Sequence, residues 1–109
     1  MTITYKVLGQ ILSTATVMTT LYTVPASNST VVSTITACNQ SSTATTFTIA
    51  VQPAGITLAP KHYINYATPL PGNDTITITL GITLATTDVI AATAGTSLVS
   101  FSAFGSEIS

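Results

Sequence analysis

The chain has 109 residues, the size of one domain, and 5% of them are charged, against about a quarter in an ordinary domain. With two basic residues and no arginine, it cannot neutralise many phosphates, so we expect no nucleic-acid partner. The 24 threonines and 11 serines interrupt every apolar run well before the ~18 to 20 residues that span a bilayer, so we also expect no membrane partner. No basic segment followed by an apolar block opens the sequence, which predicts synthesis in a cytoplasm without a cleaved signal peptide.

Alternating apolar and polar residues predict strands from the start of the chain. Residues 2–8 form the first, with Ile3, Tyr5 and Val7 on one face, and Gly9 ends or bulges it. Residues 11–20 read as a loop or a weak edge strand. A short strand over 21–24 stops at Pro25, and a turn follows over 26–29.

Two longer strands come next, over residues 30–39 and 45–51. The first has apolar groups on both faces, which favours a central position in a sheet. Its predicted faces are Val31, Ile35 and Ala37 on one side and Val32 and Cys38 on the other; in the second strand Phe47, Ile49 and Val51 point inward. The short polar link between the two strands makes them the best hairpin candidate in the chain.

The second half of the chain contains the clearest pattern, T-I-T-I-T-L-G-I-T-L over residues 75–84. Its even positions are aliphatic and its odd positions are threonine or glycine, as in a strand with one buried and one wet face. The apolar positions are Ile76, Ile78, Leu80, Ile82 and Leu84. Shorter strands are predicted over 62–66, 88–92 and 98–104, and the last of them places Val99, Phe101 and Ala103 on one face.

About seven or eight strands separated by turn signals, with no convincing helix, indicate an all-β protein. We therefore predict a single-domain antiparallel β-sandwich over residues 1–109, with either a jelly-roll or an immunoglobulin-like arrangement.

The residues that could perform catalysis or bind metal are few. His62 lacks a neighbouring carboxylate, and Asp74 and Asp88 stand outside any calcium-loop pattern, so we expect neither an enzyme nor a metal or other cofactor. The lone Cys38 has no basic neighbour in sequence and reads as a small buried hydrophobe.

Two surface features have alternative interpretations. The aromatic cluster of His62, Tyr63 and Tyr66 could stack on a sugar ring, although such tyrosines more often line a half-buried strand. The T-x-T runs are similar to the threonine faces of ice-binding proteins, but those proteins repeat the motif at a fixed period and this chain does not.

Several short phrases, in their order along the chain, resemble small virion proteins of tailed bacteriophages, including cyanophages. The resemblance runs nearly end to end, and each phrase alone is short and apolar. The phrases are Tyr5-Lys6-Val7-Leu8-Gly9-Gln10, Leu21-Tyr22-Thr23-Val24-Pro25-Ala26, Cys38-Asn39, Ile49-Ala50-Val51-Gln52-Pro53-Ala54-Gly55, His62-Tyr63, Gly81-Ile82-Thr83-Leu84-Ala85 and Phe104-Gly105-Ser106-Glu107-Ile108.

The resemblance implies a capsid decoration (cement) protein or a component of the neck, tail or fibres, located in a virion assembled in the host cytoplasm. It implies the major capsid protein or other virion proteins as partners, and no catalytic residue. A hydroxyl-rich surface with few charges costs little to desolvate, which suits a homo-oligomer or another protein–protein assembly. The predicted contacts lie in the terminal segments 2–8 and 101–108 and on the threonine face: Ile3, Tyr5, Val7, Thr75, Thr77, Thr79, Phe101 and Phe104.

Overall fold

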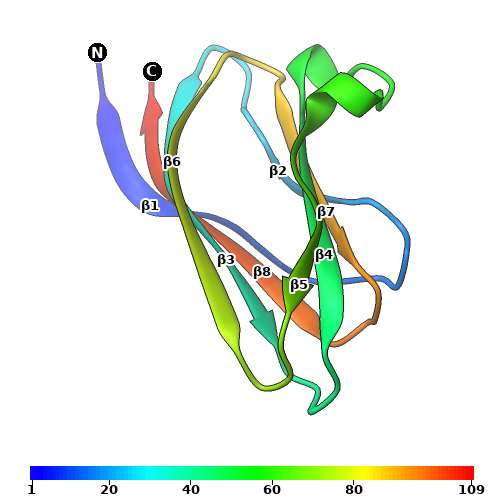
Figure 1. Cartoon of the computed structure of the whole chain (residues 1–109). Helices are drawn as coiled ribbons and strands as arrows, with labels where there is room; N and C mark the ends of the chain where they lie inside the picture. Colours follow the sequence, from blue (N-terminus) through cyan, green and yellow to red (C-terminus); the bar gives the residue numbers. More distant parts are fainter.

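The computed structural model describes the whole chain except the side chain of Leu80. Eight strands and two short 3-10 turns make up the described fold (Figure 1). The strands are β1 (Ile3–Leu12), β2 (Thr19–Thr23), β3 (Ser29–Asn39), β4 (Thr45–Gln52), β5 (Tyr63–Leu70), β6 (Thr75–Leu84), β7 (Val89–Ala94) and β8 (Val99–Ile108); the turns are η1 (Pro53–Gly55) and η2 (Pro60–His62). The predicted all-β class is confirmed.

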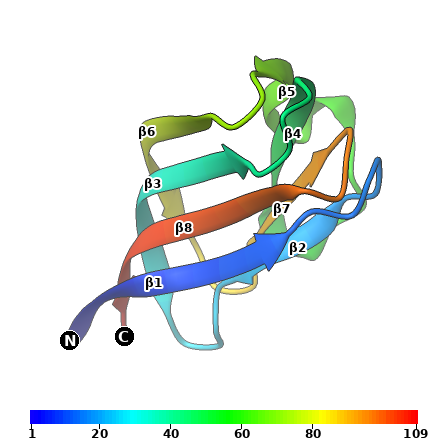
Figure 2. The ribbon, with the colours of Figure 1, turned by 90° about the horizontal axis from the view of Figure 1, so that it is seen from below.

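The strands form two four-stranded antiparallel sheets that pack face to face (Figures 1 and 2). Sheet 1 has the order β1-β8-β3-β6, and sheet 2 has the order β2-β7-β4-β5. Each strand in sheet 1 therefore has a counterpart in sheet 2 that adjoins it in the chain. This is the order of a jelly roll, so the structure selects that arrangement over the immunoglobulin-like one.

The predicted hairpin between β3 and β4 is wrong, because these strands belong to different sheets. Strand β3 pairs with β6 and β8, and the link after it crosses to sheet 2. The buried Asn39 holds this crossing: its Nδ2 donates to the carbonyls of Thr43 at 2.9 Å and Pro71 at 3.2 Å, and its Oδ1 accepts from the Ser41 N–H at 3.0 Å. Alternation in sequence reports which residues are buried, and it does not report which strand is the partner.

The core lies between the sheets and contains Phe47 and Ile49 of β4 and the three predicted inward residues of β8, whereas Val51 of β4 is only partly buried against it. Phe47 from sheet 2 and Phe101 from sheet 1 are both fully buried, and their ring centroids lie 6.2 Å apart. Val99, Ala103 and Ile49 are likewise fully buried. Burying each large side chain contributes about 1.5 to 3 kcal/mol before entropy is counted, so this layer is the main source of stability.

Strand β6 follows its predicted alternation. Ile76, Ile78 and Ile82 pack against the core and Leu84 is buried, whereas the threonines between them are exposed. Leu80 was also predicted to point inward, but its side chain lies outside the described part of the structure.

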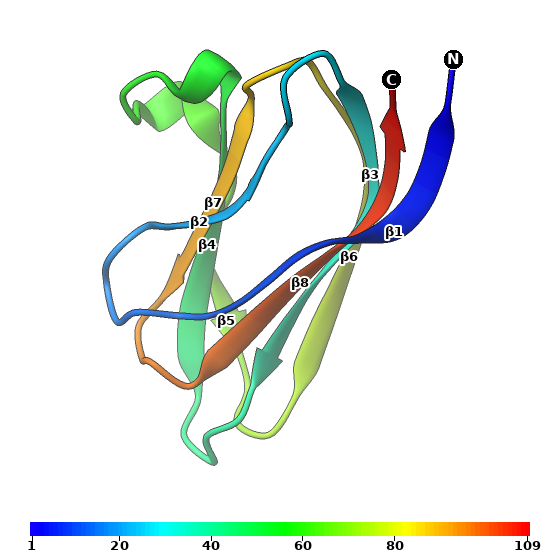
Figure 3. The ribbon, with the colours of Figure 1, turned by 180° about the vertical axis from the view of Figure 1, so that it is seen from behind.

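A line of irregularities crosses sheet 1. Strands β1 and β3 carry an extra residue at Leu8 and Ser33, each opposite residues 103–105 of β8, and β6 carries one at 80–81, opposite Ser33 of β3. We call this line the crease. Bulges bend a sheet, and the strands of sheet 1 curve strongly (Figure 3). Gly105 sits on the crease because a Cβ there would collide with the Val31 carbonyl oxygen.

The crease also explains an error in the predicted faces of β3. Val31 was assigned to the face of Ile35 and Ala37, with Val32 opposite. In the structure Val32, Ile35 and Ala37 are all buried, and Val31 is the residue on the other face. The extra residue at Ser33 shifts the alternation by one position, so residues before and after it follow different phases.

Strand boundaries differ from the prediction mainly at the ends. Gly9 lies at a bulge, so β1 continues to Leu12 through part of the segment predicted as a loop or weak edge strand. Strand β8 runs to Ile108 instead of stopping at Phe104. Strand β5 extends to Leu70 and includes Pro69. An edge strand tolerates proline, because the missing N–H costs no ladder hydrogen bond where the backbone faces the free side.

Candidate assembly surface

Beyond the crease, β1 and β8 continue side by side to the chain ends, and we call these segments the terminal half (residues 3–7 and 104–108); residues 29–32 of β3 pair with β8 alongside them. The two chain ends meet there: the Thr2 N–H donates to the Ser109 carbonyl at 3.0 Å, and the Ser109 N–H donates to the Thr2 carbonyl at 2.9 Å. Figure 2 shows both ends emerging side by side.

The outer side of the terminal half is apolar and exposed. Ile3, Tyr5 and Val7 are 43%, 82% and 48% exposed, and Phe104 lies directly opposite Val7. The structure therefore brings these four predicted contact residues onto one surface. Phe101, also predicted as a contact, is wrong, because it points between the sheets and is fully buried.

The threonine face of β6 lies on the same outer side of sheet 1. Thr75, Thr77 and Thr79 are exposed, and directly opposite them on β3 are Cys38, Thr36 and Thr34. Cys38 is half-buried rather than in the core. The β3 threonines were missed as members of this face because their side depends on the bulge at Ser33.

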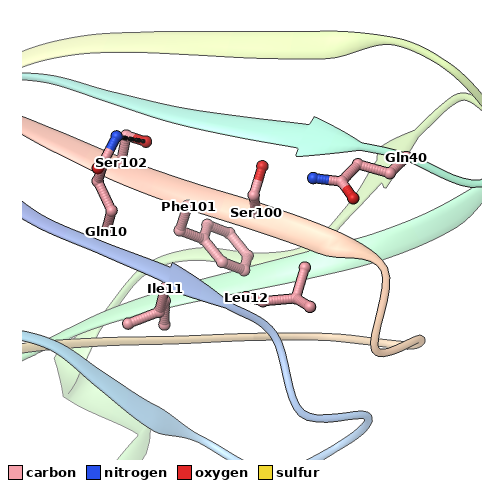
Figure 4. Close-up of a pocket in the computed structure, with 7 residues that line it drawn as sticks. All are labelled: Gln10, Ile11, Leu12, Gln40, Ser100, Phe101 and Ser102. Carbon is pink, nitrogen blue, oxygen red and sulfur yellow. Dashed lines mark hydrogen bonds between the residues drawn. The ribbon is translucent and has the colours of Figure 1, made fainter.

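A shallow depression of about 420 Å³ lies at the other edge of the same side, between β1 and β8 (Figure 4). Within it Gln10 Nε2 donates to Ser102 Oγ at 3.3 Å. Its lining of amides, hydroxyls and apolar groups includes no acid, base or thiol, so no lining residue can activate the Ser100 or Ser102 hydroxyl by taking its proton. The lining residues are Gln10, Ile11, Leu12, Gln40, Ser100, Phe101 and Ser102.

The inner side of the terminal half is held to sheet 2 by a polar bridge of four residues. Glu107 accepts from Lys6 Nζ at 3.0 Å and from the Tyr22 hydroxyl at 2.6 Å, and that hydroxyl lies 2.9 Å from Thr30 Oγ1. Tyr22 and Thr30 are buried. Burial and the bond to Glu107 raise the pKa of Tyr22 to about 12, whereas the Tyr22 and Lys6 hydrogen bonds lower the pKa of Glu107.

The other two side-chain carboxylates, those of Asp88 and Asp74, accept hydrogen bonds from backbone N–H groups. Asp88 accepts from the N–H groups of Ala54 at 2.8 Å and Ala85 at 2.9 Å, which ties η1 to the turn before β7. Asp74 accepts from the Thr75 N–H at 2.8 Å. Among the described residues no three metal-binding side chains lie together, and no described helix is long and apolar enough to cross a membrane.

His62 and the tyrosines next to it lie in η2 and β5. His62 is buried, its Nδ1 accepts from the Ala59 N–H at 2.9 Å, and its Nε2 has no hydrogen-bond partner in the described part of the chain. Tyr63 and Tyr66 meet edge to face at 4.9 Å beside Pro60, around a hollow of about 430 Å³. Edge-to-face rings do not form one flat platform for a sugar.

Comparisons with known proteins add little. No protein-family model matches the chain, and no curated protein matches it in sequence. Among solved structures, a chain in the structure of infectious bursal disease virus, Gx strain, has a TM-score of 0.49 and 12% sequence identity. The alignment covers 97% of this chain and 31% of that one, so this chain spans about a third of the length of the viral chain. The resemblance to tailed-phage virion proteins remains a prediction.

Proposed function

We propose that the protein is a non-enzymatic structural component of a virion, and specifically a decoration protein that binds the assembled capsid of a tailed phage. The observation that carries the proposal is the outer side of sheet 1. There the apolar terminal half adjoins a field of threonine and serine side chains, while Lys6 and Glu107 lie on the opposite side of the same sheet and pair with each other.

Such a surface suits extensive protein–protein contact. Burying apolar groups contributes about 25 cal/mol per Å², and hydroxyls are far less costly to desolvate than ions. A decoration protein that binds the assembled shell and not its free subunits stabilises the shell by mass action. Ile3, Tyr5, Val7 and Phe104 would supply the apolar part of the contact with the major capsid protein, and Thr75, Thr77 and Thr79 the polar part.

The fold is compatible with this role. Jelly rolls occur in viral capsid domains, and also in lectins and cupins. Because one fold serves many functions, the proposal rests on the surface and on the resemblance in sequence.

A second candidate is a neck, tail or fibre component that binds a receptor or carbohydrate. The observation in its favour is the hollow beside Tyr66, whose side chain is 70% exposed. The edge-to-face geometry of Tyr63 and Tyr66 makes sugar stacking a weaker proposal than the apolar contact surface.

Particle occupancy tests the proposal. Purified particles of the phage that encodes the chain should carry hundreds of copies by quantitative gel densitometry, whereas a few to a few dozen copies would favour the neck, tail or fibres. The double variant Tyr5→Ser, Val7→Ser should lose occupancy, and the matched control Tyr66→Ser should keep it. Full occupancy of the double variant would exclude the terminal half as the contact. An enzymatic activity lost in His62→Ala or Asp74→Asn would contradict a purely structural role.

A further inference from the structure

Strand β6 is an edge strand whose first half, residues 75–79, lacks the usual protection. Each sheet has two edges, and natural proteins block edges with charges, proline, bulges or short strands. Strand β1 carries Lys6 and a bulge, β2 has 5 residues and a register shift, and β5 contains Pro69 and two register shifts. Strand β6 contains neither a charge nor a proline, and its one irregularity, at residues 80–81, lies beyond the regular segment 75–79.

The free hydrogen-bonding groups of β6 belong to its threonines. The Asn39 N–H donates to the Asp74 carbonyl at 2.8 Å, and residues in an antiparallel ladder alternate between facing the partner and facing away. The N–H and C=O groups of Thr75, Thr77 and Thr79 therefore point to the free side. The Thr75 N–H confirms this direction, because it bonds to the Asp74 carboxylate instead of to β3.

The exposed segment is also self-complementary. Residues 75–79 read T-I-T-I-T in both directions. A second copy placed antiparallel about a two-fold axis at Thr77 puts Thr77 opposite Thr77, Thr75 opposite Thr79 and Ile76 opposite Ile78. Threonines then face threonines on the outer side, and the partly buried isoleucines meet on the core side. The two Asp74 carboxylates lie about 20 Å apart along the strands, so like charges do not meet.

We infer that β6 pairs with β6 of a second copy of this chain about a two-fold axis at Thr77, which joins two copies of sheet 1 into one eight-stranded sheet. The three threonines of each copy form about six hydrogen bonds across the axis. The second copy displaces the Asp74 carboxylate from the Thr75 N–H. This pairing goes beyond the decoration role, because it applies to the free protein whatever particle carries it.

The size of the contact sets its strength. At one hydrogen bond per ~100 to 200 Å², about six bonds correspond to roughly 600 to 1,200 Å² of buried surface. That lies at or below the lower limit of a standard stable interface, so we expect dissociation in the micromolar range.

The first test compares two substitutions at the axis by sedimentation velocity over micromolar to millimolar concentration. Thr77→Pro removes the central N–H, which points away from β3 to the free side of β6, so the variant should fold and remain monomeric. Thr77→Val keeps the N–H and should dimerise like the original chain. A monomeric original chain, or a folded Thr77→Pro variant that dimerises equally well, would overturn the inference.

The second test reads the register and does not depend on whether the proline variant folds. In a Cys38→Ser background, Thr77→Cys places two thiols on residues whose Cα atoms are about 5.5 Å apart, so a short thiol-specific cross-linker should join them. Thr79→Cys places its thiols about 14 Å apart, and the same reagent should fail. Equal cross-linking of both variants would overturn the proposed axis. Loss of the dimer with normal particle occupancy would leave the decoration role intact. A normal dimer with loss of particle occupancy would overturn the decoration role and leave the β6 pairing intact.

Discussion

Strands β1 and β8 run side by side from the core to the chain ends, yet the crease divides them into two parts stabilised by different chemistry. On the core side, Val99, Phe101 and Ala103 are each fully buried between the sheets. On the other side no residue from 104 to 108 is fully buried, and the attachment to sheet 2 is the polar bridge centred on Glu107. The β1–β8 ladder is thus attached to sheet 2 by apolar packing on the core side of the crease and by hydrogen bonds to a titratable carboxylate in the terminal half.

The largest effect should come from the apolar attachment. Phe101→Ala removes a ring packed against Phe47 and should lower the free energy of unfolding by about 3 to 5 kcal/mol, since the cavity cannot fully collapse. Urea denaturation measures this. The matched control Phe104→Ala, at an outward position of the same strand, should cost much less. Similar losses of unfolding free energy in both variants would mean that the core side of β8 and the terminal half are stabilised in the same way.

A smaller and more local effect is expected at the bridge. Tyr22→Phe keeps the buried ring and removes the hydroxyl that contacts Glu107 and Thr30, so the loss should be about 2 kcal/mol. Hydrogen exchange should show faster opening of residues 104–108 while the amides of residues 99–103 stay protected. Tyr5→Phe, which changes an exposed hydroxyl, is the control and should leave both regions unchanged. Uniform loss of protection across β8 would count against a separate attachment.

Acid should weaken the terminal half before the core. Because the folded pKa of Glu107 is lowered from its ordinary value of 4.5, its contribution to stability is fully present above pH 4.5 and is lost as the pH falls through the folded pKa. Exchange rates of residues 104–108, measured from pH 6 to pH 2 and corrected for the intrinsic rate, should rise over this range. In Glu107→Gln this pH dependence should disappear, and its persistence would assign the effect to another carboxyl group.

The smallest effect on stability should come from the exposed side of the terminal half. Tyr5→Ser should change the free energy of unfolding by no more than about 0.5 kcal/mol, because the side chain is 82% exposed. Chemical denaturation of the free protein measures this. A loss above about 1 kcal/mol would show that Tyr5 supports the fold and would weaken its assignment as a contact held open for a partner.

Sequence reasoning succeeded where burial alone decides the pattern. The alternation in 98–104 and 75–84 predicted strands whose described inward residues lie in or against the core, because a half-buried strand must present one face to apolar neighbours. It failed where one residue changes the register. Serine at position 33 has no property that marks a bulge, so the chain does not reveal that Val32, and not Val31, shares the buried face of Ile35 and Ala37.

The bridge could not be predicted for a different reason. Lys6 and Glu107 are 101 positions apart, and only the pairing of the first strand with the last brings them together. Their rarity was the available signal: in a chain with five charged residues, most charges are expected to have a specific partner. The partner itself depends on strand order, which alternation does not contain. The same limit produced the wrong hairpin between β3 and β4.

The mutual hydrogen bonds of Thr2 and Ser109 make the folded chain nearly a closed ring. A short peptide linker would join the two ends with little strain. In the unfolded state, the same closure would remove the entropy of a loop of about 100 residues, which is worth roughly 4 to 5 kcal/mol in the chain-entropy model. A cyclised form would thus gain stability chiefly by restricting the unfolded chain. It would also suppress fraying at the ends, so the terminal half could be immobilised without altering any side chain on its outer surface.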